Sequence, residues 1–404
     1  MDALKRSFSR IRPGAAVGVD GVSKTDYEKD LEGNLQRLHL KLRTGRYSHQ
    51  PIRRVHIKKE NGKMRPIGVS TVEDKIVQGA LREALEAVYE QDFLNCSYGF
   101  RPRRSAHDAI RVLDHVLSDG SGNWVLEIDI KSYFDSLDRK WLKKMLQVRV
   151  PDGSIQRLVG KCLKVGILDG EQFSWSEEGT TQGSSLSPLL GNVYLHYALD
   201  LWFEKVVKPR LRGKAHLVRY ADDAVFTFER LDEATWFHKA LEERMAKFNL
   251  ELHQDKTRLI NFRRPASEGG PKAETFDFLG FTLYWMKTKR GRWAIRLKTK
   301  RASRNRFLKQ IYDWCRDYRH KSVKEQHAAL HRRIRGFFQY FGVNGNTLSL
   351  TTVRESVKRC WRKWLSRRSQ RSLVTWNRFH QILQSFPLPD ARVYVRIWGA
   401  PLKL

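Results

Sequence analysis

Two adjacent carboxylates, Asp222 and Asp223, lie between two apolar, β-prone runs within residues 217–226. Tyr220 and Ala221 precede them, so the order along the chain is Tyr-Ala-Asp-Asp. This pattern predicts a β-hairpin with the two acids at its tight turn. Adjacent acids in a turn are often only solvated turn formers. Here both flanks are apolar and a matching acid lies elsewhere, which favours a chemical role.

The third acid, Asp129, lies near the end of another apolar run at residues 124–130. A strand bearing one acid, followed later by a hairpin bearing two, is the layout of a nucleic-acid polymerase palm. Carboxylates so placed can hold two Mg²⁺ ions, which clamp the attacking and leaving oxygens of an in-line phosphoryl displacement. We therefore interpret Asp129, Asp222 and Asp223 as catalytic residues and Mg²⁺ ligands. Asp135 is left outside the metal site, because a salt bridge or helix cap explains it.

Sequence blocks in a fixed order extend this pattern along nearly the whole chain. They occupy residues 18–22, 42–47, 62–69, 73–78, 97–107, 129–135, 179–192, 220–223, 252–257 and 276–281. With these blocks the chain resembles the reverse transcriptases encoded by group II introns. The resemblance implies an α+β right-hand polymerase, with antiparallel sheet and helices in the fingers and palm and an α-helical thumb. It also implies RNA-directed DNA polymerase activity.

The resemblance assigns further substrate-contacting residues. Lys59, Lys63 and Arg65 are expected to bind the triphosphate of the incoming nucleotide. The two lysines would act as point charges and the arginine through its planar guanidinium. Phe134 is expected under the sugar ring, where it excludes a 2′-hydroxyl, although a core role is the alternative. The loop at Gln182 and Gly183 is expected beside the nascent base pair, before a helix capped by Ser187 with Pro188 in its first turn.

Lys256 is assigned to pyrophosphate departure, with an ordinary surface lysine as the alternative. The sequence departs from the family pattern at Lys58 and Thr181, where proline is usual. Neither departure removes a predicted metal ligand.

Charge indicates a polyanionic partner. The chain has 76 Lys+Arg and 44 Asp+Glu, a formal net charge of +32. Residues 287–371 alone contribute +22 and are also rich in aromatic residues. Cations bind phosphates, and aromatic rings stack on bases or pack between helices. We expect RNA template, group II intron RNA, a DNA primer or target, and dNTPs as partners. A membrane-surface role is the weaker alternative, and no apolar run is long enough to span a bilayer.

The four scattered cysteines form no Cys-x-x-Cys pair, which argues against a zinc site or disulfide framework and suits a reducing compartment. We expect no secretory signal peptide. We expect a bacterial cytoplasmic protein, with nucleoid association or an organellar location left open. The oligomeric state is also left open.

Domain organisation follows from the blocks and from helical periodicity. We expect fingers and palm at residues 1–285, a basic thumb or maturase domain at 286–375, and a short tail at 376–404. One helix is predicted at residues 24–42, a hairpin turns at Asn61-Gly62, and a basic hairpin or connector turns at Arg290-Gly291. Three amphipathic helices are expected in the thumb. No endonuclease module follows them in the sequence, so we expect the form of the family without one.

Two functions from different classes fit these features. One is a reverse transcriptase that extends a primer and serves the mobility of its intron. The other is an RNA-binding maturase that assists splicing without chemistry of its own. A host-adopted reverse transcriptase in DNA repair or phage defence is a further alternative, and the protein sequence does not separate it from the intron-encoded case.

Overall fold

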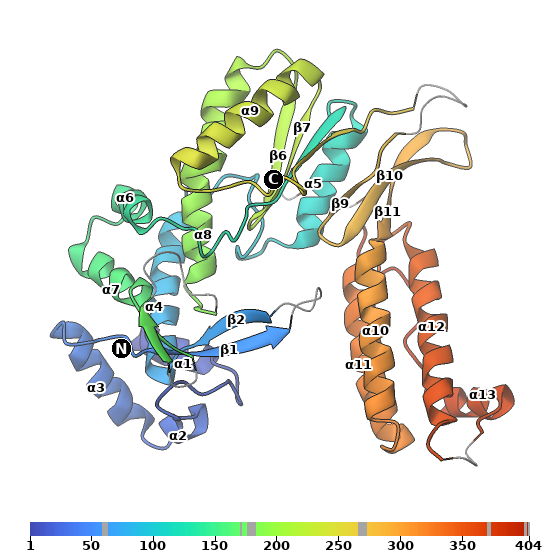
Figure 1. Ribbon diagram of the computed structural model, residues 1–404, viewed down its shortest axis with the longest axis horizontal. Helices are drawn as coiled ribbons and strands as arrows, with labels where there is room; N and C mark the ends of the chain where they lie inside the picture. Colours follow the sequence, from blue (N-terminus) through green and yellow to red (C-terminus); the bar gives the residue numbers. More distant parts are fainter. Residues whose placement is uncertain are drawn as a thin grey trace. The chain divides into compact units, whose positions relative to one another are not determined.

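The computed structural model describes residues 1–58, 64–169, 172–175, 183–265, 273–369, 373–399 and 402, in a mixture of helices and sheets (Figure 1). The chain forms two compact units, each made of three segments. Unit 1 comprises Met1–Arg104, Ile128–Phe226 and Asp232–Arg258. Unit 2 comprises Ser105–Glu127, Thr227–Leu231 and Leu259–Leu404. The division into fingers, palm and thumb at residues 285 and 375 stays a prediction.

Unit 1 begins with three helices: α1 (Asp2–Arg10), α2 (Lys24–Glu28) and α3 (Leu31–Arg43). The single helix predicted at residues 24–42 is wrong, because the chain leaves helical geometry at Asp30, which has φ −132° and ψ 55°. The side-chain amide of Asn34 donates to the carbonyl of Tyr27 and so satisfies one carbonyl at the end of α2. Periodicity alone did not show this break, since the apolar positions continue through it.

The predicted hairpin in the fingers is present. Strand β1 (Ile52–Lys58) pairs antiparallel with β2 (Met64–Val69), and the turn at Asn61-Gly62 lies outside the described residues. Two further strands, β4 (Gly166–Asp169) and β5 (Gln172–Trp175), extend this sheet in the order β2-β1-β4-β5, with β1 and β4 parallel. Sequence reasoning did not foresee these two strands.

Four helices of unit 1 follow the pattern of their apolar residues: α4 (Val72–Tyr89), α6 (Arg139–Arg149), α7 (Gly153–Leu163) and α8 (Ser187–Leu195). All residues of α8 except Pro188 are buried, as expected for a helix that is apolar on every side. Two π-helical segments, His196–Asp200 and Phe203–Val207, continue it. The predicted cap is corrected: Leu186 is the N-cap, and Ser187 is already helical.

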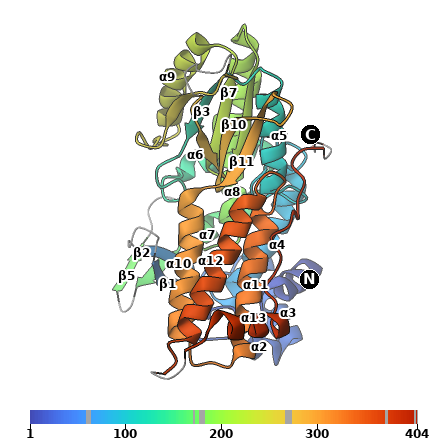
Figure 2. The same ribbon diagram turned by 90° about the vertical axis from the view of Figure 1, so that its right-hand side faces the viewer.

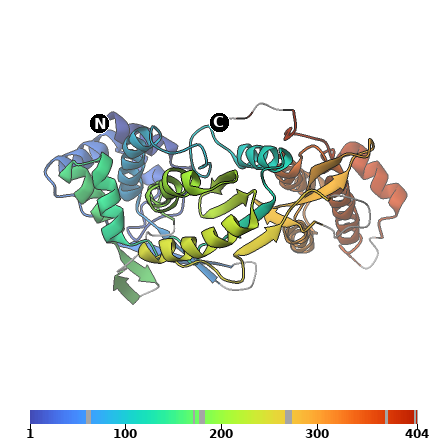
Figure 3. The same ribbon diagram turned by 90° about the horizontal axis from the view of Figure 1, so that it is seen from above.

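The hairpin predicted around the paired acids is present as β6 (Ala215–Tyr220) and β7 (Asp223–Phe228). The sheet that contains it has the order β6-β7-β3-β8, where β3 is Trp124–Ile128 and β8 is Arg258–Asn261. Helix α9 (Leu231–Lys247) lies beside the hairpin (Figures 1 and 3). It packs on the hairpin through Phe237, whose ring centre lies 4.7 Å from that of Phe226. The apolar flanks of the acids are therefore core residues, which fixes the turn on a rigid support.

Unit 2 contains α5 (Ala106–Ser118) and a three-stranded sheet of β9 (Phe276–Phe278), β10 (Phe281–Lys287) and β11 (Trp293–Thr299). Gly291 turns β10 into β11 with φ +73°, so the predicted hairpin is confirmed. The three predicted helices are also present: α10 (Arg301–Asp317), α11 (Val323–Phe341) and α12 (Thr347–Leu365), side by side in Figure 2. A short helix, α13 (Trp376–Ser385), lies where only a tail was predicted.

Within the described ranges, the helices are all too short or too polar to cross a lipid bilayer.

Candidate active site

The turn between β6 and β7 presents the paired acids. Ala221 has φ +58°, a left-handed conformation that costs energy for any residue with a β-carbon. Asp222 is half-buried and Asp223, the first residue of β7, is exposed. Because the flanking strands are buried, the two carboxylates are held at the edge of a rigid element. The strain at Ala221 requires neighbours that hold the turn.

Gly99 is one of these neighbours. A β-carbon at this position would lie 2.3 Å from the backbone nitrogen of Ala221, so only glycine fits. The adjoining backbone is tied to β6, since Tyr98 donates to the Arg219 carbonyl and Arg219 to the Cys96 carbonyl, both at 2.8 Å. The segment containing Gly99 therefore lies directly against the turn.

Arg219 holds the turn from inside. Its side chain is fully buried and makes a bidentate ion pair with Asp200, with distances of 2.8 and 2.6 Å. It also donates to the Ala221 carbonyl and the Asn192 side chain, both at 2.9 Å, and to the Ser97 hydroxyl at 2.8 Å. A buried charge needs such full pairing to be tolerated. Sequence reasoning missed Arg219, although an arginine inside an apolar strand was a signal for a buried polar network.

Asp129 follows the last residue of β3 and is fixed by a second segment of unit 1. Its carbonyl accepts from the His253 backbone at 2.8 Å, and Ile130 forms an antiparallel bridge with Leu252. Its carboxylate accepts from the Lys256 ammonium at 2.9 Å. The structure thus brings together two predicted site residues, Asp129 and Lys256, as an ion pair.

Tyr133 connects the Asp129 segment to α8. Its buried hydroxyl donates to the Gly191 carbonyl of α8 at 2.5 Å. Burial raises the pKa of this hydroxyl well above its usual value; the nearby Arg219 guanidinium opposes the rise, and the charge of Asp222 adds to it. Asp222 therefore lies within electrostatic reach of Tyr133. The next residue, Phe134, rests its ring edge against α8, 3.2 Å from where a β-carbon on Gly191 would lie.

The predicted metal ligands fit Mg²⁺ in chemistry but are not assembled as a cluster. Their donors are carboxylate oxygens, which hard divalent cations prefer. Among the residues that the structure describes, no three His, Cys, Asp or Glu side chains meet in an arrangement that could hold a metal ion. Asp222 and Asp223 are adjacent in the turn, whereas the carboxylate of Asp129 is engaged by Lys256.

The predicted nucleotide-binding residues of the fingers are only partly described. Lys59, Lys63 and Gln182 lie outside the described residues. Arg65 lies in β2 opposite Ile57, and only its backbone is described. Gly183 has φ +114°, and a β-carbon there would lie 2.3 Å from the Gly68 carbonyl oxygen. Gly183 therefore packs on the backbone of β2.

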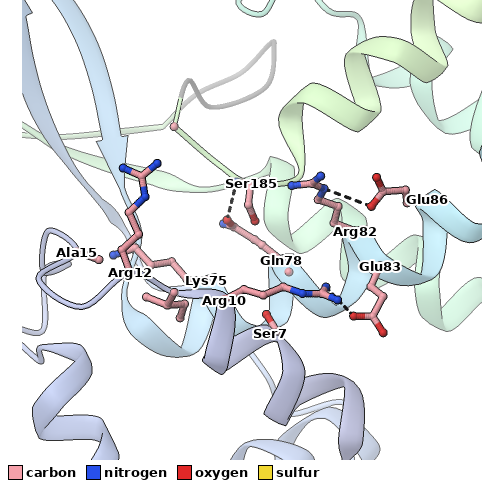
Figure 4. A pocket seen from close by; sticks show the side chains of 13 residues that line it. Ser7, Arg10, Arg12, Ala15, Lys75, Gln78, Arg82, Glu83, Glu86 and Ser185 are labelled. Atoms are coloured by element: carbon pink, nitrogen blue, oxygen red, sulfur yellow. Dashed lines mark hydrogen bonds and ion pairs between the residues drawn. The ribbon is translucent and has the colours of Figure 1, made fainter. Parts of the chain in front are cut away.

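A cavity of about 590 Å³ lies in unit 1 between α1, α4 and the Gly183–Ser185 segment (Figure 4). Gln78 lines the cavity, and its side-chain oxygen accepts a hydrogen bond from the Ser185 backbone N–H at 3.3 Å. Arg10 pairs with Glu83 at 2.7 Å, and Arg12 and Lys75 line the opposite side (Figure 4). Four cationic side chains and two carboxylates, Glu83 and Glu86, thus line a hollow that Gly183 and Ser185 also border.

This chain belongs to the reverse transcriptase family, because residues 57–283 match the family model described as reverse transcriptase (RNA-dependent DNA polymerase). The matched span includes the Asp129 segment, α8 and the β6–β7 hairpin. The match confirms the right-hand polymerase fold that the sequence predicted.

Similar proteins show which reverse transcriptases this chain resembles. Protein YkfC of Escherichia coli (strain K12) is 42% identical over 207 residues, which is 50% of this chain and 53% of that protein. Group II intron-encoded protein LtrA of Lactococcus lactis subsp. cremoris is 40% identical over 191 residues, 47% of this chain and 32% of LtrA. A 91 kDa protein in the cob intron of Schizosaccharomyces pombe is 36% identical over 206 residues, 51% of this chain and 25% of that protein. The matches confirm the predicted resemblance, and they span about half or less of these relatives.

Proposed function

We propose that this protein is an RNA-directed DNA polymerase that extends a primer 3′-hydroxyl with dNTPs on an RNA template. In this reaction the hydroxyl attacks the α-phosphorus of the nucleotide and pyrophosphate leaves. The observation that supports the proposal most is the strained turn that presents Asp222 and Asp223, backed by the buried Arg219 and located in the span that matches the reverse transcriptase family. Such a site works by positioning and charge neutralisation, which a rigid hairpin supplies.

Asp129, Asp222 and Asp223 are the residues that would hold two Mg²⁺ ions. Bound there, the ions would neutralise charge on the reacting phosphate and the attacking and leaving oxygens. Lys256 is proposed to assist pyrophosphate departure; its ammonium lies 2.9 Å from the Asp129 carboxylate, which supports a position beside the proposed metal site.

The remaining residues are proposed to bind and select the nucleotide. Phe134 rests against α8, and its ring is proposed to block a 2′-hydroxyl. Lys59, Lys63 and Arg65 are proposed to hold the triphosphate. Gln182 and Gly183 are proposed to lie along the nascent base pair; the fit of Gly183 on the β2 backbone supports a fixed position for Gly183 itself.

Primer extension tests the proposal. The parent protein is compared with a double variant, Asp222→Asn and Asp223→Asn, on an RNA template with a DNA primer, dNTPs and Mg²⁺. A matched control, Glu242→Gln with Glu243→Gln, removes two charges from the exposed face of α9. We expect extension by the parent and the control, and none by the Asp222/Asp223 variant, with RNA binding equal in all three. A parent that binds RNA tightly yet extends no primer contradicts the proposal.

A second function, binding of group II intron RNA to assist its splicing, is favoured by the basic segment at residues 287–371, which contributes +22 of the net charge. Two observations suit it: residues of α10, α11 and α12 form a bundle with cationic outer positions, and relatives are named as intron-encoded proteins. Splicing of a precursor RNA by the parent and by the Asp222/Asp223 variant tests it. Equal acceleration by both proteins supports a splicing role that is independent of polymerisation, and no acceleration by either contradicts it.

A further inference from the structure

A network of buried polar side chains surrounds the start of α4 in unit 1. The side chains of His49 and Asp74 are almost fully buried, and so is Gln78. The hydroxyls of Tyr47 and of Thr71, the N-cap of α4, each donate to the Asp74 carboxylate at 2.7 Å. Buried polar groups are costly unless they are paired, and a fully paired network holds its members rigidly. The proposed chemistry uses none of these side chains, so the network calls for another role.

The surroundings of His49 decide which of its ring nitrogens carries the proton. Nδ1 lies 2.7 Å from the Gln50 carbonyl oxygen and 3.5 Å from the Asp74 carboxylate. A carbonyl and a carboxylate both accept hydrogen bonds, so Nδ1 is the protonated nitrogen of the neutral ring. Nε2 then carries a lone pair, and it lies 2.9 Å from the side-chain nitrogen of Gln78. His49 therefore accepts from Gln78 and fixes which end of the amide faces the ring.

The Gln78 amide carries this orientation on to the backbone of Ser185. The amide nitrogen also donates to the Ser70 hydroxyl at 3.2 Å, so both of its protons are used. The amide oxygen accepts from the Ser185 N–H at 3.3 Å (Figure 4). A backbone N–H only donates, so a reversed amide would set two donors against each other and lose this bond. The bond to Ser185 thus depends on the orientation that His49 sets.

The bond from Ser185 is one of two anchors of the short segment Gly183–Ser185. At the other end Gly183 fits against β2, where a β-carbon would lie 2.3 Å from the Gly68 carbonyl oxygen. The segment is therefore held by β2 at one end and by α4 at the other. Loss of the Gln78 oxygen would release the end that leads into α8 and leave the Gly183 end in place.

We propose that His49 and Gln78 are positioning residues for nucleotide binding, because they hold Ser185 and with it the Gly183–Ser185 segment beside the nascent base pair. The identity of that base pair rests on the proposed function. Gln78 acts on the nucleotide through Ser185, and His49 acts through Gln78. The network thereby gains a role that the predicted site residues do not cover: it sets the position of the segment next to Gln182.

Hydrogen exchange followed by mass spectrometry tests the contact without catalysis. Gln78→Leu removes the acceptor of the Ser185 N–H. Gln78→Glu keeps an oxygen for Ser185, while His49 becomes the donor to the other carboxylate oxygen. The matched control, Gln156→Leu, removes another half-buried amide of unit 1, which donates to the Val150 carbonyl at 2.7 Å. Circular dichroism checks that each variant folds.

The exchange experiment has a defined expected result. The Ser185 amide should exchange roughly three- to tenfold faster in Gln78→Leu, because one hydrogen bond is lost. Exchange at Ser185 should stay near the parent rate in Gln78→Glu and in Gln156→Leu. Equal exchange in the parent and in Gln78→Leu overturns the proposal, and so does equally fast exchange in the leucine and glutamate variants at position 78.

Primer extension then measures the effect on the nucleotide. We expect Gln78→Leu to raise the KM for dNTP by about three- to tenfold with little change in kcat, since the Asp222 turn is not moved. Gln78→Glu should restore most of the KM, and Gln156→Leu should keep the parent values. A merely structural role would instead reduce the active fraction and lower kcat without this rescue. Equal KM values in the parent and in Gln78→Leu overturn the positioning role.

A double-mutant cycle tests the order in which the two residues act. His49→Leu should raise the KM for dNTP in the same direction, and it should add little in the Gln78→Leu background. Additive effects overturn the claim that His49 acts through Gln78. Failure of the proposed polymerase function is distinguishable, because the parent then extends no primer while the exchange difference at Ser185 remains. A parent that extends primers, with exchange at Ser185 insensitive to Gln78→Leu, overturns only the positioning role.

Discussion

The guanidinium of Arg219 donates a hydrogen bond of 2.9 Å to the carbonyl of Ala221, the left-handed residue that turns β6 into β7. The same guanidinium is anchored by Asp200, which lies in the π-helical segment after α8. The turn that presents Asp222 and Asp223 is therefore connected to the helical core by one buried side chain.

This connection predicts separate effects on stability and on activity. Arg219→Ala leaves Asp200 buried without its partner and is expected to cost about 3–5 kcal/mol in the free energy of unfolding. Replacing both, as Arg219→Met with Asp200→Leu, should recover most of that loss, because no buried charge remains. Primer extension should stay low in the pair, since the Ala221 carbonyl no longer has its donor. Urea denaturation and single-turnover extension measure the two effects. A paired variant that polymerises at the parent rate contradicts a positioning role for Arg219.

Gly99 makes a second prediction about the same turn. Gly99→Ala places a β-carbon 2.3 Å from the Ala221 nitrogen, so the turn must move. Misplacement of catalytic groups by about 1 Å can cost up to about 10²-fold in rate, and we expect a loss of that order in primer extension. The control is Gly160→Ala in α7, where no atom lies within 4 Å of the added carbon. It should keep its activity and gain about 0.5–1 kcal/mol from better helix propensity. Similar activity of the two variants contradicts the close approach of Gly99 to the turn.

The local sequence pattern predicted the strands that flank the acids, but not the buried side chains that hold the turn in place. The strands around Asp222 and the strand before Asp129 were predictable because burial on both sides makes their sequences apolar. The contacts of Arg219 join residues 97, 192, 200 and 221, and the longest spans 122 positions, so periodicity could not reveal them. Periodicity also failed to predict the break at Asp30 and helix α13. At the first, a side-chain hydrogen bond from Asn34 to the Tyr27 carbonyl stands in for a backbone bond; α13 ends at Ser385, before Pro387 and Pro389.

Lys256 predicts how the site depends on Mg²⁺. Its ammonium neutralises the Asp129 carboxylate that is proposed to bind metal. Lys256→Met should therefore lower the Mg²⁺ concentration for half-maximal extension, by up to about fivefold, since partly exposed ion pairs contribute about 0.2–1 kcal/mol. The maximal rate should also fall if Lys256 assists pyrophosphate departure. Lys131→Met is the control, because Lys131 pairs with Glu251 at 3.0 Å instead. An unchanged or higher Mg²⁺ requirement in the Lys256 variant contradicts competition for Asp129.

Phe134 predicts selection of the sugar. The Phe134 ring packs against α8 beside Gly191, and this contact limits the movement of the ring. Phe134→Ala should remove the steric block and raise the relative use of ribonucleotides by about 10–200-fold, the range typical of a hydrophobic contact in a pocket. Phe134→Tyr keeps the bulk and should keep the discrimination. The ratio of kcat/KM for a dNTP and the matching ribonucleotide measures the effect. An unchanged ratio in the alanine variant assigns Phe134 to core packing.

Asp114 in α5 predicts a pH dependence of stability that is separate from catalysis. Only 7% of this residue is exposed, and burial raises its pKa from 3.8 to about 6, although the Trp398 side chain and the Arg296 charge oppose the shift. Between these two pKa values the folded protein binds more protons than the unfolded chain. The free energy of unfolding therefore falls as pH rises from about 4 to 6, and the stabilisation present below the unfolded pKa is lost. One of its carboxylate oxygens, Oδ1, has no hydrogen-bond partner among the described residues, which fits an ionised form that is poorly solvated.

Asp114→Asn removes this titration while keeping the shape of the side chain. Relative to the parent, the variant should gain about 3 kcal/mol at pH 7, since each pKa unit corresponds to about 1.4 kcal/mol, and the gain should shrink towards pH 4. Urea denaturation at several pH values measures the difference, with Asp152→Asn in unit 1 as a contrast. The Asp152 carboxylate caps α7, and its backbone hydrogen bonds with Ile155 and Ser154 lower its pKa. That substitution should instead destabilise the protein at neutral pH. A gain from Asp114→Asn that is equal at pH 4 and pH 7 means that the cause is packing, because only an ionising carboxyl makes the difference depend on pH.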